Sequence, residues 1–384
     1  MGKSINLEVF KSFFRSEQIG GFLLLFGVAI SLIIANTSMK DGFEIFLETQ
    51  IGFPFIHFSI LGWINDALMA IFFLLVGLEI KRELIEGELS SFKSAALPVI
   101  AALGGMLVPA LIFALFNKNT LTESGWGIPM ATDIAFAIAI IGLLSKHVPA
   151  SLKIFLAALA IVDDLGAILV IAIFYTKQIH FEYLAIGAGI LILLLVLNFF
   201  KVKNLLFYLL PGIFLWYFIH HSGIHATIAG VLLAFTIPTN ASNKQSPLEK
   251  IEHGLTKPVN YVIMPVFALA NTNIPFQKQM IAGLISPLGL GIILGLFVGK
   301  TFGVSLFSWL AVKLKFGHLP TGASWRHILG LGMLAGIGFT MSIFIAMLSF
   351  SKEEYILEAK FAILTASVLS GLVGFLFLKA SKNN

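Results

Sequence analysis

Long apolar runs separated by short polar segments recur along the whole chain. A helix that crosses a bilayer needs about 20 mainly apolar residues. The pattern therefore predicts about twelve membrane-spanning helices, at residues 19–35, 61–80, 95–116, 125–144, 150–175, 183–200, 205–219, 224–237, 259–273, 288–312, 328–350 and 359–378. The seventh, eighth and ninth runs are short for a full crossing. No long polar segment interrupts the series, so residues 1–384 are predicted to form a single integral-membrane domain.

Composition supports this all-α, polytopic fold class. Of 384 residues, 58% are hydrophobic and only 12% are charged, against about 25% charged in soluble domains. The mean hydropathy of +0.95 exceeds what one soluble core can absorb. The chain contains no cysteine, which excludes disulfides and thiolate metal sites.

The distribution of Lys and Arg predicts the orientation in the membrane. With the N-terminus inside, 18 basic residues fall on the cytoplasmic side, 6 fall on the other side, and Lys300 lies within the tenth run. Cytoplasmic loops are enriched in Lys and Arg, so both termini are predicted to be cytoplasmic in a bacterial plasma (inner) membrane. This asymmetry explains the net charge of +5 without a nucleic-acid partner.

Two adjacent acids, Asp163 and Asp164, lie in the middle of the fifth apolar run, residues 154–174. A charge at the bilayer centre costs roughly 2.5 to 17 kcal/mol, depending on the method. A purely structural helix has no reason to bear that cost twice in succession. The pair is therefore predicted to be functional.

A third intramembrane acid follows a predicted break in the fourth run. Pro129 lacks a backbone donor and is expected to interrupt the helix, and Thr132 and Asp133 come directly after it. Non-helical backbone is tolerated at membrane depth only where protein buries it or water reaches it. A broken helix with a carboxylate at the break indicates a transport pathway. The alternative is a simple proline kink with Asp133 near the membrane surface.

The eleventh run is predicted to be interrupted by glycines, Gly330, Gly332, Gly336 and Gly338, each of which lowers helix propensity by about 1 kcal/mol. Two interrupted runs at corresponding positions are typical of transporters with inverted repeats. The family that this chain resembles is one of the examples from which that rule was drawn. The repeats would be approximately residues 95–175 and 288–378. Alternatively, the glycines only permit close helix packing.

Lys300 is a buried cation in need of a partner. It lies well inside the tenth run, beside glycines at every fourth position that allow another helix to approach: Gly291, Gly295, Gly299 and Gly303. The carboxylates at comparable depth are Asp133, Asp163 and Asp164, and we expect Lys300 to pair with one of them. The alternative is that its side chain extends to the membrane surface.

These residue types favour exchange of a small cation for protons. Neighbouring helix positions differ by about 100° in direction, so Asp164 is expected to line a cavity while Asp163 turns toward another helix and Lys300. Carboxylate, hydroxyl and carbonyl oxygens suit a small hard cation. Carboxylates that are close together and poorly solvated bind protons more readily. Two such groups neutralised per cation would make the exchange electrogenic.

Five stretches resemble the NhaA family of sodium/proton antiporters, and the resemblance extends over almost the whole chain: FFLLVGLEIKREL (72–84), PMATDIAFAI (129–138), LAIVDDLGAI (159–168), GKTFGV (299–304) and LAGIGFTMSIF (334–344). The resemblance implies twelve spans, inverted repeats, and crossed broken helices in the fourth and eleventh spans. It implies that Asp163 and Asp164 bind Na⁺ or Li⁺ alternately with protons, and that Lys300 pairs with Asp163. Asp133 would offset the positive ends of the half-helices, with Thr132 beside the crossing. The implied exchange is two external protons for one internal sodium.

The family is also inactive at acidic pH, which the resemblance assigns to charges near the cytoplasmic entrance. The candidates here are Glu79, Arg82, Glu83, Glu252 and His253. The alternative is that they are ordinary boundary charges that follow topology. A further group, His220 to His225, has a spacing compatible with metal binding, but ordinary interfacial histidines are the favoured interpretation.

The segment between the first two spans, residues 43–58, carries β-branched and aromatic residues around Gly52 and Pro54 and is predicted to form a small outer hairpin. The family dimerises through such a hairpin, so a homodimer is expected.

Other functional classes fit less well. An intramembrane aspartyl protease places its two acids on separate helices, and a prenyl-transferring enzyme needs a D-D-x-x-D motif, whereas position 167 is Ala. The chain is therefore predicted to be a transporter without a cofactor rather than an enzyme. A proton-coupled carrier of an organic anion, with Lys300 as the substrate ligand, remains the alternative.

Overall fold

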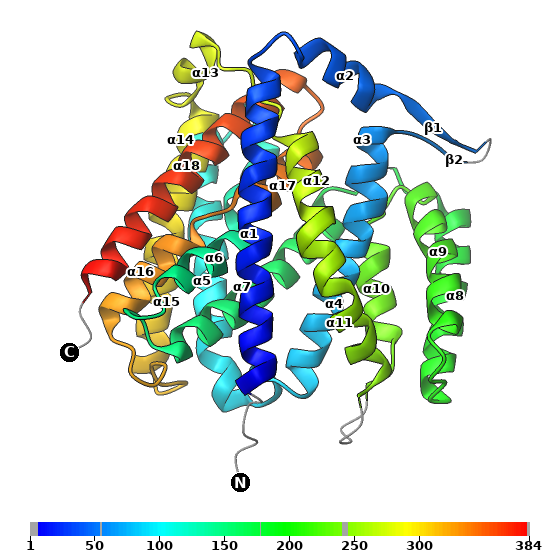
Figure 1. Ribbon diagram of the computed structural model, residues 1–384, viewed down its shortest axis with the longest axis horizontal. Coiled ribbons are helices and arrows are strands. Elements are labelled where there is room, and N and C mark those ends of the chain that lie inside the picture. The colour runs from blue at the N-terminus through cyan, green and yellow to red at the C-terminus, as the bar shows by residue number, and fades with distance from the viewer. Residues whose placement is uncertain (1–6, 54–55, 177, 240–244, 382–384) are drawn as a thin grey trace.

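The computed structural model describes residues 7–53, 56–176, 178–239 and 245–381, which form a helical bundle (Figure 1). Pro54 of the predicted hairpin, and Lys3, Lys177, Lys244 and Lys382 of the charge count, lie outside the described residues. The α-helices are α1 (Leu7–Ala35), α2 (Lys40–Glu48), α3 (Ile60–Gly62), α4 (Met69–Ile85), α5 (Phe92–Asn117), α6 (Ile134–Leu143), α7 (Ala150–Phe174), α8 (Phe181–Phe199), α9 (Leu206–His221), α10 (Ile228–Thr236), α11 (Pro247–Pro258), α12 (Met264–Asn271), α13 (Lys278–Gly283), α14 (Pro287–Leu294), α15 (Lys300–Lys313), α16 (Trp325–Ala335), α17 (Phe339–Ser349) and α18 (Glu353–Ala380).

Several helices continue into segments with different hydrogen bonding. Three π-helical segments interrupt longer helices: η1 (Trp63–Leu68), η4 (Val259–Ile263) and η5 (Gly295–Gly299). Two 3₁₀ segments are η2 (Glu88–Ser90) and η3 (Glu123–Met130). Single π-helical turns inside α-helices are frequent at functional sites, and η4 and η5 both adjoin the site described below.

The all-α, polytopic prediction is confirmed. Eight helical segments of the described chain are long and apolar enough to cross a membrane, and the pair α16 and α17 makes a ninth if counted as one bent span. The three short runs of the sequence correspond to α9 with 16 residues, α10 with 9, and α12 with 8, the last preceded by η4. The number twelve stays a prediction because α9 and α10 are shorter than a full span, and because the continuous helix formed by α11, η4 and α12 is not among the eight apolar segments.

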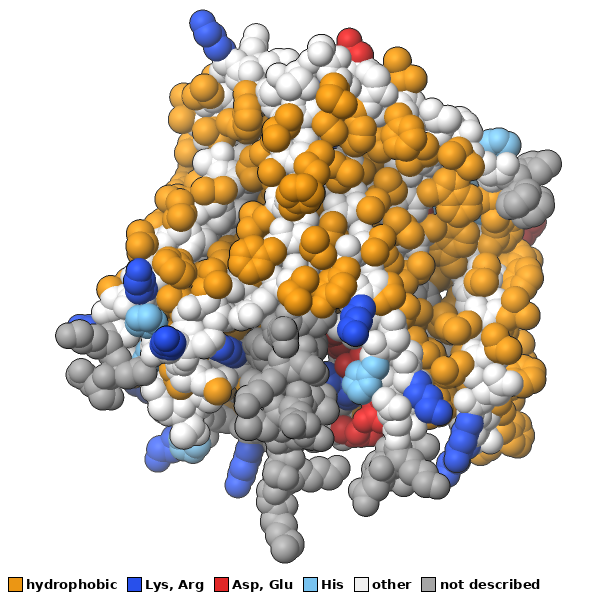
Figure 2. Space-filling view, viewed as in Figure 1, with side chains coloured by type: hydrophobic (Ala, Val, Ile, Leu, Met, Phe, Trp, Pro, Cys, Tyr) orange, Lys and Arg blue, Asp and Glu red, His pale blue; other side chains and the backbone are white. Residues whose placement is uncertain are grey.

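Apolar side chains cover the outside of the bundle. Within α8, only Gly187 and Leu194 are buried, and Ile192 is 61% exposed. Figure 2 shows hydrophobic side chains over most of this face, while Lys and Arg gather toward the end where α1 begins and α18 ends. We call this the basic end. An apolar belt of this kind belongs in a lipid bilayer, so the protein is a membrane protein.

The glycine stripe of the tenth run packs directly against α5. A Cβ atom at Gly303 would lie 2.2 Å from the carbonyl oxygen of Gly104, and one at Gly299 would lie 2.9 Å from Cα of Pro109. Side chains are therefore excluded at these positions. The close approach of backbones brings Lys300, at the first turn of α15, into the interior of the bundle.

Two short antiparallel strands lie in the region of the predicted hairpin, at the end of the bundle opposite the basic end (Figure 1). Strand β1 (Gln50–Phe53) pairs with β2 (Ile56–Ser59), with Gln50 opposite Ser59. Residues 43–48, which the sequence placed in the hairpin, instead belong to helix α2.

Candidate cation site

The fourth apolar run is interrupted at residues 131–133. Segment η3 ends at Met130, one residue after Pro129, and α6 begins at Ile134. Between them Ala131 and Asp133 are extended, with ψ angles of 151° and 99°. The break was expected at Pro129, before Thr132 and Asp133, but the interruption contains these two residues. It leaves backbone groups free for contacts outside their own helix.

The eleventh apolar run is interrupted at residues 336–338. Helices α16 and α17 are bent by 46° relative to each other at this point. A Cβ atom at Gly336 would lie 2.4 Å from the carbonyl oxygen of Leu296, and one at Gly338 would lie 3.2 Å from the carbonyl oxygen of Ala131. These glycines thus allow the break to approach two other segments of backbone.

The two breaks lie against each other and satisfy each other's backbone groups. The backbone N–H of Asp133 donates to the carbonyl of Ile337 at 2.6 Å. From the other side, the Ser342 hydroxyl donates to the carbonyl of Ile128 at 2.7 Å. Unpaired backbone groups at membrane depth each cost several kcal/mol, so these contacts explain how irregular backbone is tolerated in both runs.

Asp133 holds the amino ends of two half-helices. It is the N-cap of α6, where its Oδ1 accepts from the backbone N–H of Phe136 at 3.1 Å. Its Oδ2 accepts from the backbone N–H of Thr340, at the start of α17, at 3.1 Å, and also from the Thr340 hydroxyl. Helix amino ends carry a partial positive charge. One carboxylate, 1% exposed, therefore faces two such ends.

Asp163 is paired with Lys300. Its Oδ2 lies 2.5 Å from the Lys300 ammonium nitrogen, and both side chains are fully buried. The same oxygen accepts from the Thr132 hydroxyl at 2.8 Å. Thr132 also contacts the carbonyl of Ala335, the last residue of α16, at 2.9 Å. One oxygen of Asp163 thus connects α15 to both broken runs.

The Lys300 side chain lies in a space that small residues of α5 provide. A Cβ atom at Gly105 would lie 3.7 Å from the Lys300 nitrogen and 2.9 Å from Cγ2 of Val304. The π-helical segment η5 ends immediately before Lys300. Lys300 therefore directly follows a π-helical turn, a feature that is frequent at functional sites.

Asp164 points into a different environment. It is 2% exposed, and its Oδ1 has no hydrogen-bond partner within the described part of the chain. It lines a cavity of about 30 Å³, which has room for about one water molecule. The other polar residues that line this cavity are Glu79, Thr132, Asp133, Asn260 and Thr340. Its walls are therefore rich in oxygen ligands suited to a hard cation.

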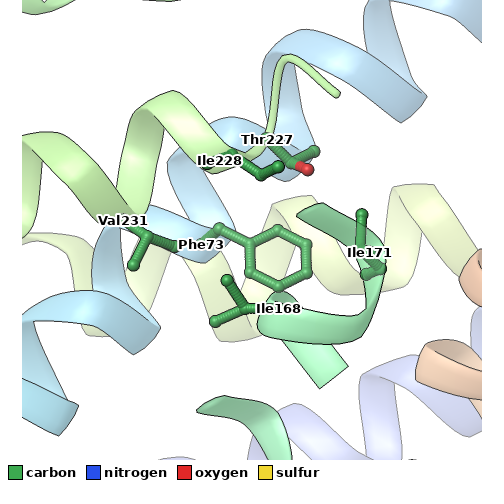
Figure 3. Close-up of a pocket in the computed structure, with 6 residues that line it drawn as sticks. All are labelled: Phe73, Ile168, Ile171, Thr227, Ile228 and Val231. Carbon is green, nitrogen blue, oxygen red and sulfur yellow. The ribbon is translucent and has the colours of Figure 1, made fainter. Parts of the chain in front are cut away.

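On the side of Asp164 away from the basic end, apolar side chains close the bundle. Ile168 is one helical turn beyond Asp164 on α7, and it meets Phe73 of α4 and Val231 of α10 (Figure 3). Ile171, Thr227 and Ile228 complete this cluster, which leaves essentially no space for water. The cavity at Asp164 includes Glu79, in the last two turns of α4, so it extends toward the basic end.

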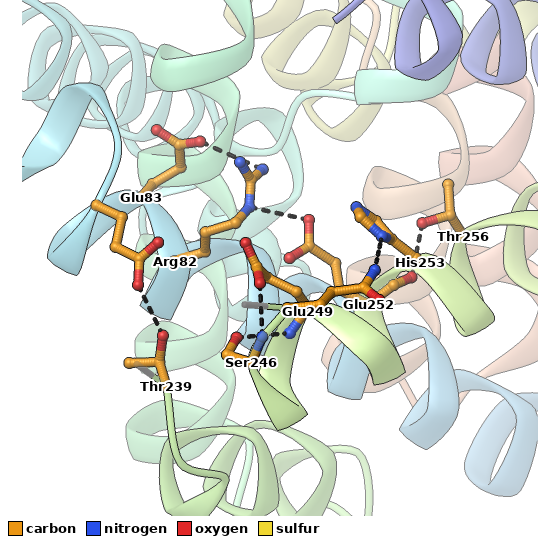
Figure 4. A network of polar contacts seen from close by, with 10 residues as sticks. Arg82, Glu83, Thr239, Ser246, Glu249, Glu252, His253 and Thr256 are labelled. Carbon is orange, nitrogen blue, oxygen red and sulfur yellow. Dashed lines mark hydrogen bonds and ion pairs between the residues drawn. The ribbon is translucent and has the colours of Figure 1, made fainter. Parts of the chain in front are cut away.

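A separate charged network lies near the end of α4 (Figure 4). The Arg82 side chain forms ion pairs with Glu252 of α11 at 2.9 Å and with Glu83 at 3.3 Å. Glu252 is 5% exposed. Burial raises the pKa of the Glu252 carboxyl above its ordinary value, and the charges of Arg82 and His253 oppose that shift. His253 contacts the Gln245 side chain at 2.9 Å.

The predicted site residues therefore fall into two groups. Asp163, Asp164, Asp133, Thr132 and Lys300 meet around the two breaks, whereas Arg82, Glu83, Glu252 and His253 lie around the start of α11. Glu79 lines the cavity of the first group.

Sequence reasoning missed two residues of the site. Thr340 was visible as a hydroxyl beyond the glycines of the eleventh run, but its contact with Asp133 depends on how the two breaks meet. Asn260, which lines the cavity, was visible as an amide at the start of the ninth run. Its only signal was a polar residue in an apolar segment.

Comparison with known proteins agrees with the resemblance. Residues 11–378 match the family model described as Na⁺/H⁺ antiporter 1. The chain is 62% identical to the protein named Na(+)/H(+) antiporter NhaA 2 of Flavobacterium johnsoniae, over 100% of this chain and 95% of that protein. It is 48% identical to the Na(+)/H(+) antiporter NhaA of Escherichia coli, over 96% of this chain and 97% of that protein. Antiporters are secondary transporters rather than enzymes. The chain belongs to the Na⁺/H⁺ antiporter 1 family.

Proposed function

We propose that the protein is an electrogenic antiporter that exports one cytoplasmic Na⁺ or Li⁺ for two external protons. The observation that carries this proposal is Asp164, a buried carboxylate whose Oδ1 has no partner among the described residues and which lies in a small cavity lined by further oxygens. Such a group needs a cation or a proton to compensate its charge. Competition between the two for one carboxylate is the physical basis of exchange.

In this mechanism the two aspartates have different roles. Asp164 is the direct ligand of the cation, together with oxygens of Thr132 and Asp133. Asp163 is the switch: when a cation arrives, its oxygen moves from Lys300 and Thr132 toward the cation. When the cation leaves, one proton binds Asp164 and a second binds within the Asp163–Lys300 pair as it forms again, so two protons are taken up for each cation released.

The cavity and the apolar cluster support access from one side at a time. The cavity reaches Asp164 from the side of Glu79, whereas Phe73, Ile168 and Val231 close the opposite side. With the basic end in the cytoplasm of a bacterial cell, both termini are inside and the cavity opens inward. Outward access then requires the broken helices, which we propose belong to inverted repeats at residues 95–175 and 288–378, to move relative to the apolar cluster.

The test is exchange in everted membrane vesicles that hold a proton gradient. Addition of Na⁺ or Li⁺ is expected to dissipate the gradient, as reported by a pH-sensitive fluorescent dye. In proteoliposomes, the membrane potential at which net flux reverses should correspond to two protons per cation. If the gradient responds only to an organic anion, the protein is a carrier of that anion, with Lys300 as its ligand, and the antiporter proposal is wrong.

We also propose that Glu252, with Arg82, Glu79, Glu83 and His253, regulates activity by pH. Glu252 connects α11 to α4 through Arg82, and α11 continues through η4 into the cavity wall. Because burial raises the pKa of Glu252, its carboxylate takes up a proton at a higher pH than an exposed glutamate. Protonation removes the charge of Glu252 from its pair with Arg82 and thereby alters the contact between α11 and α4, which closes down transport at acidic pH.

Glu252→Gln is expected to lower exchange activity at alkaline pH, where Glu252 of the wild type is ionised, because the variant imitates the protonated residue at every pH. Its unfolding temperature provides a second measure. A group whose folded-state pKa is raised stabilises the fold below its unfolded pKa, and this contribution is lost as the pH rises through the folded pKa. The difference in unfolding temperature, variant minus wild type, should therefore increase with pH. The exposed Glu182→Gln is the matched control and should change neither curve.

We further propose that the protein forms a homodimer through strands β1 and β2. The strands lie at the edge of the bundle (Figure 1), and Ile51 is 53% exposed. An edge strand presents unpaired backbone groups that a second copy can meet. Deletion of residues 50–59 should give monomers in a cross-linking or light-scattering measurement, whereas dimers of the deletion variant would contradict this interface.

A further inference from the structure

Asn260 is a buried polar residue that the exchange scheme above does not use. It is 7% exposed and lies in the π-helical segment η4, between α11 and α12. It lines the same cavity as Asp164, together with Glu79. A side-chain amide is costly to bury in an apolar segment unless polar contacts compensate it, and the cavity that Asn260 lines also presents carboxylate and hydroxyl groups.

The backbone around Asn260 explains how it reaches the cavity. Pro258, just before η4, has no N–H to donate, and the helix passes into π-type hydrogen bonding at Val259. On its other side, Asn260 packs against α1 so closely that a Cβ atom at Gly20 would lie 3.0 Å from Cβ of Asn260. A π-helical turn at this point alters the direction of the residues within it, and Asn260 is one of them.

We propose that Asn260 is a specificity-determining residue that supplies a neutral oxygen to the cation on its way between the cytoplasm and Asp164. This inference rests on the proposed function. Amide oxygens are good ligands for hard cations. A neutral ligand in the same cavity as a carboxylate replaces part of the water shell without holding the cation too strongly for release. Na⁺, which takes more oxygen ligands than the smaller Li⁺, depends on this oxygen more.

The closing experiment compares three variants with wild type in proteoliposomes, at one fixed pH and over a range of Na⁺ and Li⁺ concentrations. Asn260→Leu has nearly the same size but no oxygen. We expect its KM for Na⁺ to rise about tenfold, equivalent to about 1.4 kcal/mol, with a smaller rise for Li⁺ and a nearly unchanged maximal rate. Asn260→Asp should lower the KM for Na⁺, because it adds a charged oxygen to the cavity.

Asn271→Leu is the matched control in the same continuous helix. The Asn271 amide is also buried and pairs with Asn65 at 2.7 Å, and unlike Asn260 it does not line the cavity. Its removal is expected to lower the unfolding temperature while the KM values for both cations stay unchanged. A purely structural role of Asn260 would give the same result for Asn260→Leu, and that outcome would overturn the inference.

Binding can also be measured without transport. Na⁺ that binds the folded protein raises its unfolding temperature in detergent according to its concentration relative to Kd. Asn260→Leu should need about ten times more Na⁺ than wild type for the same increase. If Asn260→Leu does not fold, Asn260→Asp decides: unchanged Na⁺ affinity in that variant refutes the inference. Absence of Na⁺-dependent exchange in the wild type would instead refute the proposed function.

Discussion

Asp164→Asn is expected to abolish Na⁺- and Li⁺-dependent dissipation of a proton gradient. Asparagine keeps the size of the side chain but removes its charge and its proton-binding ability. A unit charge about 4 Å from a cation contributes about 4 kcal/mol at an effective dielectric constant of 20, which corresponds to a roughly 10³-fold loss of affinity. The measurement is exchange in everted vesicles, together with the increase in unfolding temperature caused by Na⁺ in detergent.

The fold should survive this substitution. Asp164 Oδ1 has no hydrogen-bond partner within the described residues, so Asn removes a buried charge without breaking a hydrogen bond at that atom. An unfolding temperature equal to or above that of wild type, combined with absent Na⁺ stabilisation, would identify Asp164 as a ligand. Retained exchange in Asp164→Asn would show that another group binds the cation.

Lys300→Met is expected to have the largest effect on stability. It leaves Asp163, whose side chain is fully buried, without its counter-charge and with the Thr132 hydroxyl as its remaining hydrogen-bond partner among the described residues. Removal of one partner of a buried ion pair typically costs about 3–5 kcal/mol. The unfolding temperature in detergent should fall strongly, while the amount of membrane-inserted protein reports whether the chain still folds.

The double variant Asp163→Asn with Lys300→Met separates the charge effect from packing. Removing both charges is expected to restore most of the stability, because a buried ion pair contributes little relative to neutral residues of similar size. Such recovery is a coupling between the two positions, as a double-mutant cycle measures it. Equal stability of wild type and Lys300→Met would mean that Asp163 is neutral in the folded protein.

Much of the fold could be predicted because lipid imposes simple rules. Apolar runs of bilayer length predict helices, and the fifth run became α7, residues Ala150–Phe174, with boundaries close to those expected. The runs that became α9, α10 and α12 were ambiguous, since helices shorter than a bilayer leave little signal in hydropathy. Residues 43–48 were assigned to the wrong element because β-branched and aromatic residues also occur in short amphipathic helices, as in α2.

The sequence by itself determined that the protein is a membrane protein, which acids lie at membrane depth, and which runs are broken. It could do so because the free-energy cost of burying a charge, or of placing Pro or Gly inside an apolar helix, depends on the local sequence. The tertiary structure alone decided how these parts meet. Asp163 contacts Lys300, 137 positions away; the directions of neighbouring residues on one helix favoured this pairing and the family resemblance implied it, but the contact itself depends on how α7 and α15 pack. Asp133 caps α17 as well as α6, and Asn260, within a π-helical turn, lines the cavity of Asp164. These are relations between helices distant in the chain, and no local pattern encodes them.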